Sequence, residues 1–402
     1  MISIEDVRIA EQRLKGIIHT TPLDHSSTFS EFAGQQVYLK LENLQKTGSF
    51  KVRGSYNKMV SLGRDEVDKG VIAASAGNHA QGVAYSSRML EVPCTVVMPK
   101  DAPISKIQAT KRYGAKVELH GAVFDEALAY ALELQEQRGA TFVHPFDDEA
   151  VIAGQGTIGL EILEQLDDVD AIVCPVGGGG LIAGLALAVK ERNPAIQVYG
   201  VQAVACSSMK QSLEQKKRVT VESYPTMADG IAVKTPGALN FELIQKYVDD
   251  LYCVDEMEIA RTMLMLLERN KLLVEGAGAS GLASLLYQKI PLKGKKVVTV
   301  LSGGNVDVNF LSRIIEHGMV EAGRYCKFTT VIQDKPGKLK RILDIIYEQQ
   351  GNVQNVSHEH FGKNILPGDV QLRISLEARD QGHIDQIMTV LMERGYEIDL
   401  LK

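Results

Sequence analysis

The sequence predicts an α/β protein of open parallel sheets, followed by a smaller ferredoxin-like domain. Short apolar segments, which are typical of buried parallel strands, alternate with helix-length stretches such as 78–90 and 125–139. These expected strands are 70–75, 94–99, 116–121, 171–176, 197–202 and 295–302. The alternation stops near Gly323, where we place a domain boundary.

The residues after this boundary predict a β-α-β-β-α-β order, which is the ferredoxin-like order. The expected strands are 327–333, 352–361, 370–378 and 396–401, with helices in 334–351 and 379–395. Apolar and polar residues alternate along 370–378, which suits a sheet with one solvated or partner-covered face. We therefore expect domains at 1–323 and 324–402, with a small subdomain at about 50–150 inserted in the first.

Charge and composition argue against several classes of protein. The chain has 402 residues and a net charge of −6, so it lacks the basic surface that nucleic-acid binding through bulk charge requires. The longest apolar stretch, 181–189, is about half of a membrane span, and the N-terminal segment has no apolar targeting core. The five cysteines are far apart and form no C-x-x-C pair, so we expect reduced thiols and a cytoplasmic protein.

The glycine run in 176–184 follows an expected strand and opens an expected helix. Glycines let the backbone approach a ligand closely, and a helix N-terminus offers unpaired N–H groups to an anion. We expect a phosphate site here, the alternative being a tight turn. A dinucleotide would call for an acidic residue at the end of the next strand, where Gln202 stands, so a monophosphate fits better.

Residues 42–55 place a lysine at the start of an expected helix. Ser49 is the expected N-cap, which puts Lys51 in the first helical turn. The positive end of the helix dipole disfavours an ammonium, and a lowered pKa with partial burial is the condition for a nucleophilic amine. From this segment alone, a surface lysine in a basic stretch is the favoured interpretation.

Two further turns follow expected strands. In 74–82, Ser75, Asn78 and His79 offer polar groups beside free N–H groups, which suits a carboxylate, although simple helix capping stays open. In 301–307, Ser302 would point its hydroxyl into the cleft, the alternative being a turn serine.

Two other segments are predicted to be structural. The small residues of 275–281 indicate a close helix contact, and Asp229 is a capping residue or a cation ligand. We assign no metal site.

Taken together and in this order, the motifs S-F-K-x-R-G, S-x-G-N-H, G-G-G-G-L and S-G-G-N resemble those of pyridoxal-phosphate enzymes of the tryptophan-synthase-β type, also called fold type II. Within that group the chain resembles the threonine ammonia-lyases, or threonine dehydratases, over about residues 5–320. The tail resembles an ACT regulatory domain, whose entry signature D-x-P-G-x-L matches 334–339. The resemblance implies two open twisted sheets, pyridoxal 5′-phosphate as cofactor, and deamination of L-threonine, with L-serine as a secondary substrate.

The resemblance also implies roles for individual residues. Lys51 resembles the lysine that carries the cofactor and removes the α-proton, and Phe50 flanks it. Asn78 resembles the partner of the cofactor 3′-oxygen, and Ser302 that of the ring nitrogen. The phosphate cradle would be Gly177, Gly178, Gly179, Gly180 and the Leu181 N–H, and the substrate-carboxylate loop Ser75, Ala76, Gly77, Asn78 and His79.

Two alternatives share this resemblance. Serine racemases carry a second serine where Ala76 stands, and a methyl group cannot deliver a proton, so Ala76 favours the lyase. A degenerate enzyme that survives as an amino-acid sensor is the remote alternative. For the tail, the resemblance implies an amino-acid effector at Gln333 to Leu339 and pairing between chains, hence a homo-oligomer, dimer or tetramer. A nucleotide effector is the alternative, since some ammonia-lyases of the family respond to one, although they generally lack this domain.

Overall fold

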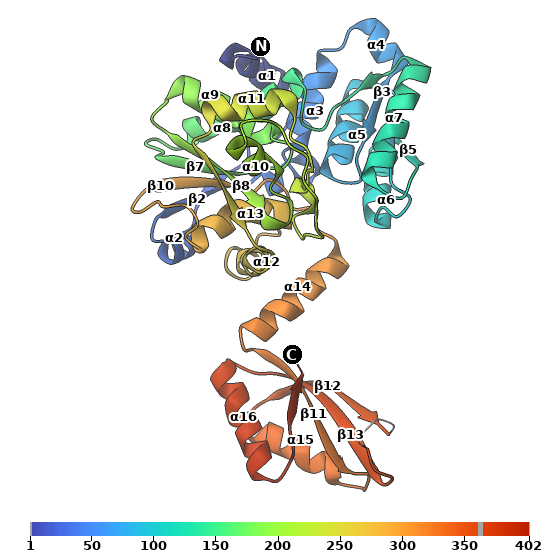
Figure 1. Ribbon diagram of the computed structural model, residues 1–402, viewed down its shortest axis with the longest axis vertical. Coiled ribbons are helices and arrows are strands. Elements are labelled where there is room, and N and C mark those ends of the chain that lie inside the picture. Colours follow the sequence, from blue (N-terminus) through green and yellow to red (C-terminus); the bar gives the residue numbers. More distant parts are fainter. Residues whose placement is uncertain (1, 361–364, 402) are drawn as a thin grey trace. The chain divides into compact units, whose positions relative to one another are not determined.

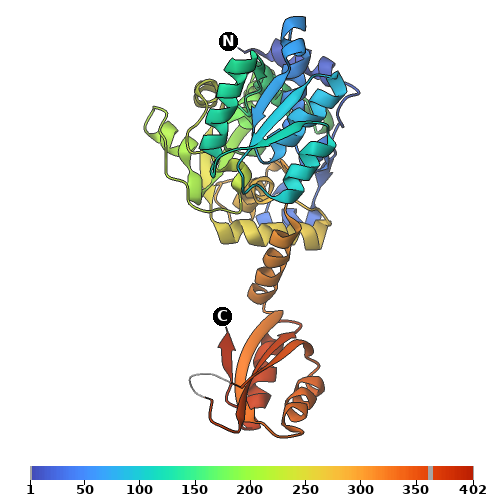
Figure 2. The same ribbon diagram turned by 90° about the vertical axis from the view of Figure 1, so that its right-hand side faces the viewer.

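The computed structural model of the chain describes residues 2–360 and 365–401 (Figures 1 and 2). It divides into two compact units, Met1–Asp307 and Val308–Lys402, here called unit 1 and unit 2. The predicted α/β class is confirmed, whereas a functional boundary near Gly323 stays a prediction. In the part of the chain that is described, no helix combines the length and apolar character needed to cross a membrane.

The larger sheet of unit 1 has six strands in the order β1-β2-β10-β7-β8-β9. Neighbouring strands are parallel except for β1 and β2. The strands are β1 (Leu23–His25), β2 (Gln36–Lys40), β7 (Ala171–Pro175), β8 (Gln197–Ala203), β9 (Asp250–Val254) and β10 (Lys296–Val300). Because parallel strands run in one direction, the loops after β7 and β10 emerge at the same edge of the sheet.

The smaller sheet of unit 1 has four parallel strands in the order β5-β4-β3-β6. They are β3 (Val71–Ala74), β4 (Cys94–Met98), β5 (Lys116–Leu119) and β6 (Thr141–Phe142). All six strands expected in this region of the chain exist, but the expectation that 116–121 is buried was wrong. β5 is an edge strand with a neighbouring strand, β4, on one side only. Its residues are therefore less covered, and Leu119 is 44% exposed.

Helices cover the faces of both sheets, as Figures 1 and 2 show. In unit 1 they are α1 (Ile4–Leu14), α2 (Ser27–Ala33), α3 (Lys51–Val60), α4 (Arg64–Lys69), α5 (Asn78–Leu90), α6 (Ile104–Arg112), α7 (Phe124–Arg138), α8 (Glu149–Gln165), α9 (Gly180–Arg192), α10 (Ser208–Glu214), α11 (Ala238–Tyr247), α12 (Glu256–Met265) and α13 (Gly276–Leu286). Short 3₁₀ turns include η1 (Glu42–Leu44) and η4 (Asp229–Ile231).

Helices α8 and α9 pack closely in the main apolar core of unit 1. Residues 181–189 of α9 are all buried, which explains why this segment is apolar all round rather than on one face. The close approach needs glycine, because a Cβ on Gly156 would lie 2.8 Å from the Gly184 carbonyl oxygen. This packing fixes the start of α9, where the glycine run lies.

Unit 2 begins with α14 (Val308–Glu321) and confirms the predicted β-α-β-β-α-β order. Its further elements are β11 (Tyr325–Gln333), α15 (Lys338–Glu348), β12 (Asn352–Glu359), β13 (Asp369–Glu377), α16 (Gln381–Glu393) and β14 (Asp399–Leu401). The antiparallel sheet has the order β12-β13-β11-β14, and its apolar residues pack with those of α15 and α16 in a separate core. Residue 361, the last of the predicted strand 352–361, lies outside the described residues.

Candidate active site

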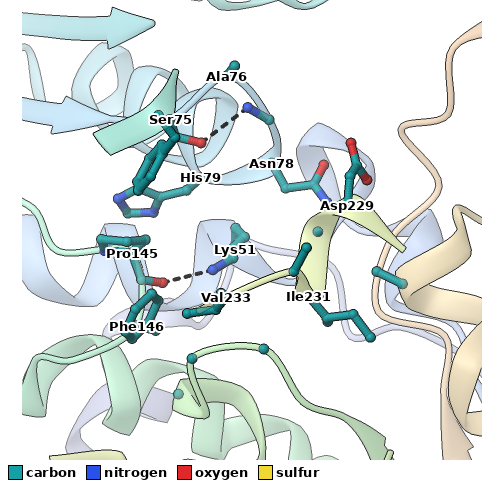
Figure 3. Close-up of a pocket in the computed structure, with 18 of the residues that line it drawn as sticks. Lys51, Ser75, Ala76, Asn78, His79, Pro145, Phe146, Asp229, Ile231 and Val233 are labelled. Carbon is teal, nitrogen blue, oxygen red and sulfur yellow. Dashed lines mark hydrogen bonds between the residues drawn. The ribbon is translucent and has the colours of Figure 1, made fainter. Parts of the chain in front are cut away.

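A pocket of about 700 Å³ in unit 1 lies at the carboxyl ends of strands from both sheets (Figure 3). Its walls include the loop after β3, the glycine run after β7 and Ser302 after β10. Every residue that the sequence analysis selected for cofactor or substrate lines this pocket: Phe50, Lys51, Ser75, Ala76, Gly77, Asn78, His79, Gly177, Gly178, Gly179, Gly180, Leu181 and Ser302. The fold thus brings together segments that are up to about 250 residues apart.

Lys51 is the first residue of α3, as predicted, and its amine faces the pocket. Lys51 Nζ donates a hydrogen bond to the Pro145 carbonyl oxygen at 2.8 Å, which Figure 3 shows as a dashed line. Burial lowers the pKa of Lys51 to about 8, and the negative charge of Glu275 acts in the opposite direction. A lysine with this pKa exists partly as the neutral, nucleophilic amine near neutral pH.

The predicted cap of α3 was wrong. Phe50 rather than Ser49 is the N-cap residue, and no side chain caps this helix. Ser49 instead has extended backbone and forms an isolated bridge with Gly303, and its buried hydroxyl has no hydrogen-bond partner among the residues that the structure describes. Ser302 is held nearby, because its carbonyl oxygen accepts a hydrogen bond from the Phe50 N–H at 3.1 Å.

The glycine run has the features of an anion cradle. Helix α9 begins at Gly180, and its N-cap, Gly179, has a φ of +100° and no side chain that could satisfy the first N–H groups. A Cβ on Gly178 would lie 2.5 Å from the Phe146 ring, and one on Gly180 would lie 2.6 Å from the Phe146 carbonyl oxygen. Only glycines allow this backbone to approach so closely, and its free donors suit a phosphate group.

The loop after β3 is organised by its own polar groups. The Gly77 N–H donates to Ser75 Oγ at 3.1 Å, and α5 then begins at Asn78 with no side-chain cap. Burial and the nearby charge of Lys51 lower the pKa of His79 to about 3, so its imidazole is neutral. His79 Nε2 lies 2.8 Å from the Val143 carbonyl oxygen, and since a carbonyl only accepts, Nε2 carries the hydrogen. His79 therefore anchors the loop to the start of the 143–146 segment.

The sequence analysis missed Glu275, which also lines the pocket. It is the N-cap residue of α13. The glycines after it do pack closely, as expected, but against Met227, Gly303 and Thr299, which lie in a loop, a turn and strand β10. Burial and the negative charge of Asp229 raise the pKa of Glu275 to about 7. Glu275 Oε1 accepts a hydrogen bond from Asn78 Nδ2 at 2.7 Å. An acidic residue directly before a run of small residues was the only signal for this site residue in the sequence.

Two ion pairs lie among the charged residues that line the pocket. Lys106 Nζ lies 3.3 Å from Asp229 Oδ2, and Lys234 Nζ lies 3.3 Å from Asp125 Oδ2. Asp229 thus pairs with a lysine, and among the described residues no group of three histidine, cysteine or acidic side chains is arranged to hold a metal ion. The site described here is therefore built around an amine, a set of backbone N–H groups and a buried carboxyl.

Comparisons with known proteins agree with this arrangement. A family model described as "Pyridoxal-phosphate dependent enzyme" matches residues 14–303. The chain is 51% identical over 401 residues to an L-threonine ammonia-lyase of Thermotoga maritima, which covers 100% of both chains. It is 47% identical over 323 residues to the catabolic L-threonine dehydratase of Escherichia coli K12, which covers 80% of this chain and 98% of the relative.

A solved structure shows the same architecture. The serine racemase of Dictyostelium discoideum superposes with a TM-score of 0.72 at 40% identity, covering 76% of this chain and 99% of that chain. The pocket residues suit the cofactor of this family, because the half-buried Lys51 amine faces the same cavity as an uncapped, glycine-lined helix N-terminus. From its sequence, its fold and these matches, the chain belongs to the pyridoxal-phosphate-dependent enzymes and, among them, to the family of the L-threonine ammonia-lyases.

Proposed function

We propose that this protein deaminates L-threonine to 2-oxobutanoate and ammonia, and L-serine to pyruvate as a secondary activity. The observation that carries the proposal is the half-buried, pocket-facing Lys51 amine, whose lowered pKa leaves it nucleophilic beside the glycine cradle. Full-length similarity to a threonine ammonia-lyase supports the choice of substrate. Bound pyridoxal phosphate supplies an electron sink for negative charge at the substrate α-carbon.

The residues of the chain would divide the work as follows. The backbone N–H groups of Gly177 to Leu181 would hold the phosphate, and Lys51 Nζ would hold the cofactor covalently. During turnover, the neutral Lys51 amine would accept the α-proton of the substrate. The loop from Ser75 to His79 would bind the substrate carboxylate through its N–H groups. Ser302 would give the ring nitrogen a neutral hydroxyl partner.

A racemase reaction is the alternative, since a serine racemase shares this fold. Racemisation requires a proton donor on the opposite face of the planar intermediate, and the Ala76 methyl group has no proton to give. We therefore expect elimination rather than racemisation. Activity on threonine, serine, D-serine and O-acetylserine separates these reactions in one assay series.

The decisive test uses Lys51→Ala. The variant should lose covalent cofactor binding, seen as loss of the visible absorbance of the lysine-bound cofactor, and nearly all turnover of threonine. Wild-type turnover by Lys51→Ala would refute the assignment. A wild-type protein that binds pyridoxal phosphate but releases only D-serine from L-serine would replace the lyase by the racemase.

For unit 2 we propose an amino-acid effector site and assembly into a homo-oligomer. Its β-α-β-β-α-β order supports an ACT-like domain, and the turn from Gln333 to Leu339 follows its first strand, where the resemblance places the effector. A single such domain per chain would pair with a copy from another chain. Isoleucine or valine should therefore shift the threonine saturation curve. If a chain ending at Gly323 still responds fully, the effector site lies elsewhere.

A cytoplasmic location stays a prediction.

A further inference from the structure

A chain of hydrogen bonds links Asn78 to three other segments of unit 1. Asn305 Nδ2 donates to the Thr47 carbonyl oxygen at 2.7 Å and to Asn78 Oδ1 at 2.7 Å. Asn78 Nδ2 in turn donates to Glu275 Oε1 at 2.7 Å. Of these four residues, Asn78 and Glu275 line the pocket, and Figure 3 shows the Asn78 side chain at its wall.

The donor and acceptor roles along this series of hydrogen bonds follow from its first member, the Thr47 carbonyl. The Thr47 carbonyl can only accept, so the Asn305 atom that faces it must be Nδ2. The second hydrogen of that nitrogen then points to Asn78, which must answer with Oδ1. Asn78 Nδ2 is thereby turned to Glu275, whose oxygen accepts. One backbone carbonyl thus determines the orientation of two amides, which would otherwise be interchangeable.

Glycines near these hydrogen-bonded side chains leave room for them. A Cβ on Gly48 would lie 2.5 Å from Asn305 Oδ1, and one on Gly303 would lie 2.5 Å from Glu275 Oε1. Thr47 has a φ of +66°, which is strained for a β-branched residue. A strained threonine and two obligatory glycines at the ends of one hydrogen-bond chain indicate that its geometry is tightly specified.

We propose that Asn305 and Glu275 are positioning residues that hold the Asn78 amide in one orientation, with Oδ1 occupied and Nδ2 available to a ligand. This inference rests on the proposed function and on the role that the resemblance gives Asn78, which is contact with the 3′-oxygen of pyridoxal phosphate. One hydrogen of Asn78 Nδ2 goes to Glu275, and the second is left to donate to the ligand oxygen. The opposite orientation would present Oδ1, an acceptor, to that same oxygen.

The test measures the dissociation constant of the cofactor-free protein for pyridoxal phosphate. Asn305→Asp replaces the donor by an acceptor, so Asn78 must turn its nitrogen away from Glu275 to pair with it. We expect affinity to fall about tenfold or more, the value of one hydrogen bond to a charged group. Asn305→Ala removes the hydrogen bond that orients the Asn78 amide but does not favour the opposite orientation. It should therefore give a smaller loss of affinity for pyridoxal phosphate.

Asn43→Asp is the matched control. Asn43 is a buried asparagine, whereas Asn305 is half-buried. The Asn43 Nδ2 donates to the Leu273 carbonyl oxygen at 3.2 Å, but Asn43 is not one of the hydrogen-bonded residues that lead to Asn78. Its variant therefore loses a similar donor-to-carbonyl contact at a residue that does not line the pocket. If Asn305→Asp and Asn43→Asp bind pyridoxal phosphate within about twofold of each other, the positioning role is refuted.

Glu275 provides the conservative rescue. Glu275→Gln retains an acceptor oxygen for Asn78 Nδ2 and should bind the cofactor far better than Glu275→Leu, which leaves that donor unpaired. Equal losses in both variants would contradict the proposal.

Threonine deamination by the wild-type protein is measured in parallel. If the wild type acts on threonine while Asn305→Asp matches its control, only the positioning proposal fails. If the wild type binds the cofactor without acting on threonine, the proposed function fails.

Discussion

We expect the removal of Arg53 to cause a large loss in the free energy of unfolding. Arg53 lies on α3 two residues after Lys51 and is completely buried. Its guanidinium binds both oxygens of Glu42, at 2.8 and 2.7 Å, and both oxygens of Glu161, at 2.6 and 3.0 Å. A fifth hydrogen bond reaches Thr157 Oγ1 at 3.1 Å. All five donors of a guanidinium are therefore used.

Replacing Arg53 with methionine would leave the buried carboxyl of Glu42 and the partly buried carboxyl of Glu161 short of a partner. Glu161 keeps the ammonium of Lys40 at 2.6 Å, but among the hydrogen bonds described Glu42 keeps only the Thr21 hydroxyl at 2.5 Å. Removing one member of a buried pair costs about 3–5 kcal/mol, because the remaining charge stays desolvated. That is a large part of the roughly 5–15 kcal/mol by which proteins are stable. We expect Arg53→Met to lower the unfolding free energy by this amount.

Urea unfolding of the full chain, followed by circular dichroism, measures this loss. Bound pyridoxal phosphate should stabilise the unit that holds it, which identifies the relevant transition. Lys58→Met is the matched control, because Lys58 also lies on α3 and pairs with Asp148 at 2.7 Å, with about a fifth of each side chain exposed. We expect it to cost about 1 kcal/mol or less. If Arg53→Met costs no more than Lys58→Met, the reasoning from burial is wrong.

Two further predictions concern the pocket. Gly178→Ala should lower stability by about 1–3 kcal/mol and weaken cofactor binding, because its Cβ would overlap the Phe146 ring; an unchanged dissociation constant would contradict this. Burial and the charge of Asp229 raise the pKa of Glu275 to about 7 from 4.5, so the folded state binds more protons than the unfolded state between these values and wild-type stability falls as pH rises through this range. Glu275→Gln has no titrating carboxyl here and lacks this loss. The free energy of unfolding of both cofactor-free proteins is measured at about pH 5 and about pH 8, and the variant should be more stable relative to wild type at the higher pH.

Much of unit 1 could be predicted because parallel strands buried on both faces are continuous apolar runs. β7 and β10 are such runs, and each is followed by a glycine turn that the sequence analysis assigned to a ligand. β5 was misjudged because an apolar strand at a sheet edge has the same local pattern as a central one. Ser49 was misjudged as a cap because its extended backbone serves a bridge to Gly303 instead.

The polar chain around Asn78 could not be predicted, because nothing local specifies it. Asn78 and Glu275 are 197 residues apart in sequence, and Asn78 and Asn305 are 227 apart. Glu275 stands before a helix of small residues, so its local pattern indicates packing only. The left-handed conformation of Thr47 is likewise invisible in the sequence, since threonine is a residue that usually avoids it.

The same contacts show what holds the two sheets of unit 1 together around the pocket. Lys106 with Asp229 and Lys234 with Asp125 connect helices of the small sheet to loops of the large one. Both aspartates are about two-thirds exposed, so each pair contributes at most about 1 kcal/mol. The stronger connections are buried.

Helix α3 is the central buried connection. It packs on α5, which follows the small sheet, and on α8, which packs on α9 of the large sheet. The Asn78 amide is a second connection, because its partners Glu275 and Asn305 both belong to the large-sheet side. Lys51 begins α3, and Asn78 begins α5. Lys51 and Asn78, two of the side chains expected to meet the cofactor, therefore lie on these two links between the sheets, so any relative movement of the sheets would displace both of them at once.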